Sequence, residues 1–434
     1  MSTVHGVLIA WASVLVASSS AARACDYTSD MPERVFSVRD RTLTSERATE
    51  LVREWEQYVK DHPKSAIAYV YWVRARSITR TGGPDDLTLL EKARAIDPNC
   101  PEVLSLLAQY QFGATLSTGK PGMDQAVKNS RRAIELRPDW YEPHVNLLVH
   151  ALYFGDDAGM RDNLQAMVEK RGFSTVLMDY AFNMLATAEP DAIVFTNGDN
   201  DTFPLLALQQ VHGVRRDVLV VNISSLNVRR YAVRMLAEKA PVLTATWIDG
   251  TRRGPEDKFV PAPEILNQVA LEIEDGRWTK PVYCAVSIPV TSLPLKLSKS
   301  MIREGLLCRV RRTPAPPSSD GSMAHNAVRT DSLLTHVYRL ESALDFSHDW
   351  QRSSMTSLVT NYVGAYYRTG SYYAGIGDLD ATARMMRGAV RILQFQRRWR
   401  RPENPDVLVQ VLESWKEADP DNPEIEALLR EAKP

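Results

Sequence analysis

The chain lacks several features that would point to common classes of protein. Its 434 residues contain only four cysteines, none of them in a C-x-x-C pair, so the sequence indicates neither a zinc site nor a dithiol redox motif. No apolar run after residue 24 is long enough to cross a bilayer, which excludes a transmembrane segment there. Lys and Arg (52) almost balance Asp and Glu (53), so no overall positive charge is present to attract nucleic acid.

The amino-terminal residues 1–24 have the pattern of an export signal. An apolar run from Gly6 to Ala17 is too short to span a membrane, and Ala22-Arg23-Ala24 forms a small-x-small cleavage site. We therefore expect an exported, periplasmic or extracellular protein. A lipoprotein anchor on Cys25 is the less favoured interpretation, because Arg23 stands where a lipid-modification site needs a small or apolar residue.

Residues 40–187 have helical periodicity with recurring punctuation. Pro63, Pro98 and Pro138 each follow an apolar helix end and are separated by 35 and 40 residues. A proline stops a helix that it cannot continue, and a spacing near about 34 residues is typical of paired helices that stack in tandem. The pattern resembles tetratricopeptide repeats. Such stacks present grooves that bind proteins or peptides.

The pattern changes in residues 188–312, where short β-rich segments alternate with helical ones. We expect strands in "AIVF", "VLVVNI", "VLTATWI", "PVYCAVSI" and "EGLLCRVRR", and helices over 204–212, 227–239 and 263–274. This alternation predicts an α/β domain with a mixed or parallel sheet. Residues 313–325, rich in Pro, Ser and Gly, read as a linker, and residues 326–434 as a second tetratricopeptide-like helical region.

Two cysteines fall in the predicted strands. Cys284 lies in "PVYCAVSI" and Cys308 in "GLLCRVRR". A disulfide across the sheet and a pair of buried free thiols are both compatible with these positions.

The end of the first predicted strand is unusually polar. "AIVF" leads directly into "TNGDNDT" (residues 196–202) before the chain becomes apolar again after Pro204. A turn at Asn197-Gly198 and a helix cap at Asp201 or Thr202 would explain part of this composition. The carboxyl edge of an open α/β sheet is also where ligands bind, so a binding loop is the alternative.

A metal site is one form that such a loop could take. Asp199 and Asp201 offer two carboxylates, and Asn197 or Asn200 offers a neutral oxygen, which suits Ca²⁺ or Mg²⁺. An EF-hand is excluded, because Phe203 stands where a further ligand is needed.

A second polar cluster ends the next predicted strand. Asn222, Ser224 and Asn227 would lie beside the first loop if the two strands are neighbours. Together they would form a polar rim suited to sugar hydroxyls or an ion, with helix capping as the alternative. The candidate ligand-binding residues are therefore Thr196, Asn197, Gly198, Asp199, Asn200, Asp201, Thr202, Asn222, Ser224 and Asn227.

The block "AIVFTNGDNDTFPLLALQQVHGVRRDVLVVNISSLN" (residues 192–227) resembles the soluble, extracytoplasmic part of a bacterial domain-of-unknown-function family. Membrane members of that family are described as protein O-mannosyltransferase-like. The resemblance continues more weakly to residue 370. It is carried by the TNGDNDT residues together with Phe203, Pro204, Gln209, Gly213, Arg215, Asp217, Asn222, Leu226, Glu304, Gly305 and Leu306. The transmembrane helices that would hold a lipid-linked sugar donor are not found in this chain, which argues against membrane mannosyl transfer.

Two functions follow as expectations. The first is an exported envelope binding or scaffold protein, with helical repeats for a protein partner and an α/β domain for a ligand, connected by the resemblance to protein glycosylation. The second is a metal-dependent enzyme that acts on glycans or phosphate-containing substrates through Asp199 and Asp201.

Overall fold

A computed structural model describes residues 25–37, 39–40, 43–118, 122–237, 248, 262–314, 323–344, 354–399 and 406–432. The predicted export signal, residues 1–24, lies outside the described residues. So does most of the strand predicted at 242–248, and so do residues 315–322 of the predicted linker. No helix in the described ranges is long and apolar enough to cross a membrane.

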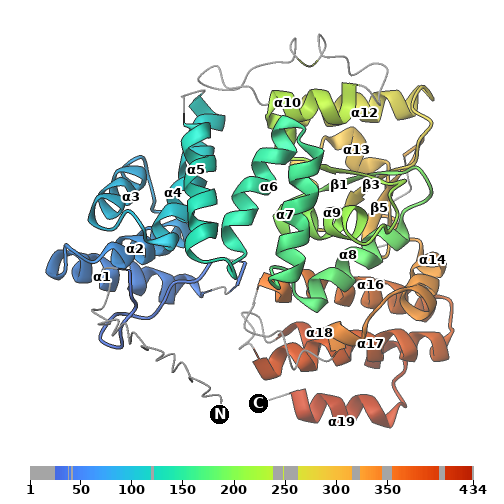
Figure 1. The fold of residues 1–434 in the computed structure, drawn as a ribbon. Coiled ribbons are helices and arrows are strands. Elements are labelled where there is room, and N and C mark those ends of the chain that lie inside the picture. The colour runs from blue at the N-terminus through green and yellow to red at the C-terminus, as the bar shows by residue number, and fades with distance from the viewer. Residues whose placement is uncertain are drawn as a thin grey trace, which may run out of the picture.

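The amino-terminal part is a run of helices, seen at the left and centre of Figure 1. Side-chain caps start several of them: the Thr44 hydroxyl accepts the Arg47 N–H before α1, and the Ser174 hydroxyl accepts the Leu177 N–H before α8. The helices are α1 (Ser45–Asp61), α2 (Ala66–Thr79), α3 (Asp85–Ile96), α4 (Pro101–Thr118), α5 (Met123–Leu136), α6 (Glu142–Phe154), α7 (Asp157–Glu169) and α8 (Thr175–Thr187). As expected, Pro63, Pro98 and Pro138 lie in the turns that follow α1, α3 and α5.

A small mixed sheet follows the helices. Its strands are β1 (Ile193–Thr196), β2 (Leu219–Asn222), β3 (Val282–Ala285), β4 (Met301–Glu304) and β5 (Leu307–Val310), in the order β2-β1-β3-β5-β4. β1 pairs in parallel with β2 and β3, whereas β5 is antiparallel to β3 and β4. The prediction of a mixed α/β sheet is thus confirmed, although β4 was not predicted.

Short helices connect the strands. They are η1 (Asp199–Asp201), α9 (Phe203–Gln210), η2 (Ser225–Asn227), α10 (Arg229–Ala232), η3 (Val233–Ala237), α12 (Ala262–Glu274), η5 (Val290–Ser292) and α13 (Leu295–Lys299). The helix predicted over 227–239 begins two residues later, at Arg229, and continues to Ala237 as α10 followed directly by the π turn η3. Residues 238–239 lie outside the described residues, and the Tyr231 hydroxyl of α10 accepts the Asn222 N–H.

The carboxyl-terminal part is again helical and lies below the sheet in Figure 1. The end of the predicted linker pairs with the sheet instead of standing apart: Arg303 donates its N–H to the Ala324 carbonyl, and Asn326 donates to the Arg303 carbonyl. The helices that follow are α14 (Ala327–Ser332), η6 (Leu333–Val337), α15 (Glu341–Leu344), α16 (Ser354–Gly375), α17 (Leu379–Trp399), α18 (Asp406–Ala418) and α19 (Pro423–Ala432).

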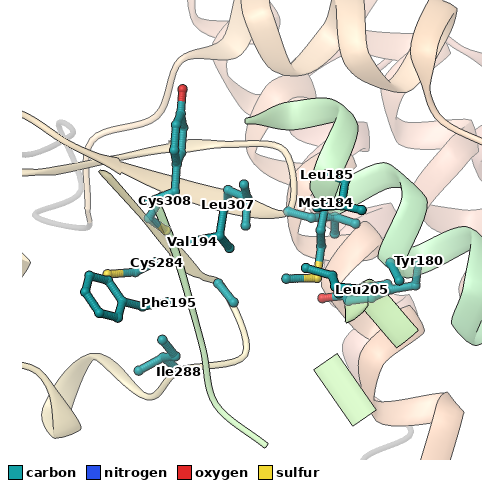
Figure 2. Packing of buried hydrophobic residues seen from close by; sticks show 14 of the residues in the cluster. Tyr180, Met184, Leu185, Val194, Phe195, Leu205, Cys284, Ile288, Leu307 and Cys308 are labelled. Carbon is teal, nitrogen blue, oxygen red and sulfur yellow. The ribbon is translucent and has the colours of Figure 1, made fainter. Parts of the chain in front are cut away.

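Buried apolar side chains form two large clusters. The sheet cluster runs from Tyr141 to Ala432 and joins α6–α8, the sheet and the carboxyl-terminal helices. The N-terminal cluster runs from Val35 to Leu107 and joins the extended segment 25–37 to α1–α4. Figure 2 shows Phe195 and Ile288 on one side of β1, and Met184 of α8 with Leu205 of α9 on the other, so both faces of the sheet are covered.

The two cysteines of the sheet follow one of the two sequence interpretations, that of buried free thiols. Cys284 and Cys308 lie opposite each other in β3 and β5 and are buried free thiols. Burial raises the pKa of both, that of Cys308 to about 11, so neither is a thiolate at neutral pH. A disulfide that was not predicted joins Cys25 to Cys100. Because that bond uses the Cys25 sulfur, the same sulfur cannot also carry a lipid.

Candidate functional site

The polar stretch 196–202 forms the connection between β1 and α9. Thr196 ends β1, Asn222 ends β2, and the two residues are partners in the parallel register. The expectation that the two polar strand ends adjoin is therefore correct. Both lie at the carboxyl edge of the sheet, where parallel α/β sheets bind ligands.

Three of the predicted residues are joined in a buried network. The Thr202 hydroxyl donates to the Gly198 carbonyl over 2.6 Å and lies 2.6 Å from the Thr196 hydroxyl. It also accepts the Asn222 side-chain amide over 3.0 Å. Thr196, Thr202 and Asn222 are all buried. These groups hold the loop against the end of β2, and their hydrogen-bonding capacity is directed inward.

Asp201 is also buried and is bonded by the protein itself. One carboxylate oxygen accepts the Gly198 N–H over 2.7 Å, and the other accepts the Asn197 N–H over 3.0 Å and the Ser287 hydroxyl. Burial raises the pKa of Asp201, while the Ser287 and main-chain hydrogen bonds act in the opposite direction. The geometry is that of a turn and helix cap, which was the simpler of the two sequence interpretations.

Asp199 has a different environment from Asp201. Its half-exposed carboxylate forms an ion pair with Arg39, which comes from the segment before α1, 160 residues earlier. The Arg39 guanidinium also lies 5.7 Å from the centre of the Phe203 ring. Arg39 was not predicted as a site residue, because nothing in the local sequence connects an arginine in an irregular segment to a distant loop.

The two aspartates are therefore held by different partners. A cation at Asp199 would have to displace Arg39, and one at Asp201 would have to displace two main-chain N–H groups and Ser287. Among the described residues, the one group of three close metal-ligand side chains is Cys25, Cys100 and Glu102, and its two cysteines form the disulfide. Metal binding by Asp199 and Asp201 stays a prediction.

The remaining predicted residues lie around the rim of the loop. The Asn197 amide donates to the Ser287 carbonyl over 3.1 Å, and the exposed Ser224 hydroxyl donates to the Asn197 carbonyl over 3.3 Å. Asn227 accepts the Ala262 N–H over 3.1 Å and so caps α12. Asn200 is half-buried beside Asp199. Ser224 is the exposed candidate, and Asn197, Gly198, Asp199, Asn200 and Asn227 are half-buried.

A family model covers this loop. The family described as TMEM260-associated domain 2 matches residues 177–248, from the third residue of α8 to beyond η3. The match supports the resemblance to a domain-of-unknown-function family and takes in the whole strand-loop-helix unit. No curated protein matches the chain.

Residues outside the loop that carried the resemblance serve the fold. The Gln209 amide donates to the main-chain carbonyls of Arg215 and Val218 over 2.7 and 2.6 Å and closes the turn after α9. Arg215 binds three carbonyls at the end of α8 and forms an ion pair with Asp217 over 2.8 Å. These residues of the matched block therefore stabilise the fold and are not arranged around a ligand site.

Proposed function

We propose that the chain is a binding or scaffold protein of the cell envelope that holds a protein or peptide partner on its amino-terminal helices. The observation that carries this proposal is a cavity of about 400 Å³ between α3, α4 and α5. Leu104 contributes an apolar patch to the cavity, and the buried Asn129 amide donates to Gln111 beside it. A groove of this type between stacked helices is the usual place for an extended peptide.

The groove is lined by more basic than acidic side chains, which indicates the charge of a suitable partner. Arg94, Lys128 and Arg132 line it, against a single carboxylate from Glu91. Arg94 is paired with Glu91 over 2.6 Å and Arg132 with Glu135 over 2.9 Å, whereas Lys128 is exposed. The groove therefore suits a peptide that carries acidic side chains.

The proposal assigns the helical regions to the tetratricopeptide-like class and places the protein outside the cytoplasm. The proline-marked helix pairs support the first assignment. The predicted export signal and the Cys25–Cys100 disulfide support the second, because disulfides persist in oxidising compartments. The resemblance to the O-mannosyltransferase-like family supports a role in glycan or glycoprotein assembly, with the rim of the β1–α9 loop as the place for a glycan.

A peptide array probed with the full chain tests the peptide groove. We expect acidic extended peptides to bind, and we expect the variant K128A/R132A to lose at least about tenfold in affinity. Arg53 and Lys64 are exposed cations on α1 and in the turn before α2, so R53A/K64A is the matched control and should bind like the wild type. Equal binding by all three proteins, or a preference for basic peptides, would remove the proposal.

The competing function is a metal-dependent enzyme that acts on glycans or phosphate-containing substrates. The half-exposed Asp199 carboxylate beside Asn200 is the observation in its favour. Thermal unfolding with Ca²⁺, Mg²⁺ and Mn²⁺ separates the two functions. Under the binding function we expect no change in Tm for the wild type, since Arg39 already neutralises Asp199. A metal-dependent rise in Tm that is absent from Asp199→Asn would favour the enzyme.

A further inference from the structure

A row of side chains crosses the sheet on the face that carries Phe195. The register places Phe195 beside Cys284, Cys284 beside Cys308, and Cys308 beside Arg303. Since neighbours in register project from the same face, the row ends in a guanidinium on the edge strand β4. In Figure 2, Phe195, Cys284, Cys308 and Ile288 mark the apolar part of this face.

A cavity of about 670 Å³ opens over the Cys308–Arg303 end of the row. Its walls come from the segment after β3, from α13, β4 and β5, from residues 314 and 323–324, and from α16. The volume is in the range of small-molecule sites, which is about 300–1,000 Å³. Ser287, which lies between the lining residues Val286 and Ile288, donates to Asp201 of the β1–α9 loop.

Most of the cavity wall is apolar. Val286, Ile288 and Val290 line one side, and Met301 and Met323 line another. Flexible methionines beside branched side chains form a surface that adapts to an aliphatic or ring-shaped body. The buried Cys308 thiol also lines the cavity and adds to this apolar character, because its raised pKa keeps it neutral.

The polar part of the wall is positively charged. Arg303, Arg368 and Lys299 line the cavity, and no carboxylate is among its described lining residues. Arg303 donates to the main-chain carbonyls of Gly305 and Asn361, over 3.3 and 3.0 Å, and to no carboxylate in the part of the chain that the structure describes. Arg303 is half-buried, and partial loss of hydration without an anionic partner is unfavourable for a guanidinium.

The pKa values of Arg303 and His325 are both lowered by burial and by the positive charge around them. Burial lowers the pKa of Arg303, and the nearby Arg368 lowers it further. Burial, together with Arg303 and Arg368, lowers the pKa of His325 to about 4. His325 is held by a 2.9 Å hydrogen bond to the Thr369 hydroxyl and stays neutral at physiological pH.

We propose that this cavity binds an organic anion in which an apolar body carries a carboxylate or phosphate group. The anionic group binds Arg303 and Arg368, the exposed Lys299 lies at the mouth, and the Val, Ile and Met side chains enclose the apolar body. The site is separate from the peptide groove between α3 and α5, so either proposal can fail without the other.

Isothermal titration of the full chain with four probes tests the site. Decanoate and decyl phosphate, each below its micelle concentration, carry the two anionic groups; decanol lacks the charge and inorganic phosphate lacks the apolar body. We expect one molecule of decanoate or decyl phosphate to bind per chain, and decanol and phosphate to bind at least about tenfold more weakly. The stronger of the two anions identifies the head group. Equal binding of decanol would overturn the proposal, as would binding by neither anion.

Variants locate the binding. R368Q and K299Q should each weaken the binding of the preferred anion by about fivefold or more, with Tm values that show the chain is folded. Lys280 is an exposed cation that does not line the cavity, and K280Q should bind like the wild type. Arg303 also supports α16 through the Asn361 carbonyl, so R303M serves as a confirmation only if its Tm is unchanged. Unaltered binding in both R368Q and K299Q would place the anion elsewhere and contradict the inference.

Discussion

Gly305 shows how a single position in the β4–β5 turn depends on a side chain far along the sequence. Its φ of +60° lies in the left-handed region that favours glycine. The Tyr338 hydroxyl approaches this turn, accepts the Leu306 N–H over 3.1 Å and lies 2.7 Å from the Thr187 hydroxyl. A side chain at position 305 would overlap that hydroxyl. Tyr338 therefore joins the β4–β5 turn to α8, and Gly305 leaves the space that its hydroxyl occupies.

Gly305→Ala should lower the free energy of unfolding by about 2–4 kcal/mol, because it adds left-handed strain to a steric overlap. Urea unfolding measures the change. Gly375→Ala is the matched control: it lies at the end of α16 with open space around an added methyl group, and it should be neutral or slightly stabilising. A Gly305→Ala variant as stable as Gly375→Ala would show that Tyr338 does not restrict the turn.

At the scale of elements, the described residues before α1, 25–37 and 39–40, connect parts of the chain whose sequence patterns are separate. Cys25 is bonded to Cys100 at the start of α4, and Trp55 of α1 donates to the Glu33 carbonyl over 3.1 Å. At their other end, Arg39 reaches Asp199 in the β1–α9 loop. These residues thus fix the N-terminal helices to one another and link them to the candidate site.

Reducing the disulfide should destabilise the N-terminal helices. The bond joins residues 75 apart, and closing a loop of that length contributes about 2–4 kcal/mol, mainly by restricting the unfolded chain. We expect dithiothreitol to lower the urea midpoint of α1–α4 in the wild type. The double variant Cys25→Ser/Cys100→Ala should already have the lower midpoint and should not respond to the reductant. A reductant effect of similar size in that variant would assign the change to another cause.

At the scale of the whole molecule, the boundary between the two apolar clusters does not coincide with the boundary between the helical region and the α/β region. α6, α7 and α8 belong to the sheet cluster together with the carboxyl-terminal helices, although their sequences continue the pattern of α1–α5. The N-terminal cluster is smaller and ends at Leu107. We expect the N-terminal cluster to open more readily than the sheet cluster.

Hydrogen exchange measures that difference. After reduction of Cys25–Cys100, amides in α1 and α2 should exchange at least about tenfold faster, while those in β1 and β3 should keep their protection, since no residue of those strands belongs to the N-terminal cluster. Equal acceleration in β1 and in α1 would show instead that the chain opens as one cooperative unit.

The loop 196–202 shows how far prediction from sequence reached. Apolar runs and turn residues located β1, α9 and β2, because hydrophobic spacing and local turn chemistry act over a few residues. They did not distinguish Asp199 from Asp201. That distinction depends on Arg39 and Ser287, which come from distant segments, so no local pattern records it.

By itself, the sequence determined where prolines end the helices, the strand-helix-strand unit and the polar edge of the sheet. Each of these follows from local conformational preference and periodic burial. Tertiary structure alone decided which cysteines pair, which aspartate is buried, and where positive charge gathers over the sheet. Those outcomes depend on close approach between Cys25 and Cys100, Asp201 and Ser287, and Arg303 and Arg368, and such distances are set only when the chain has folded.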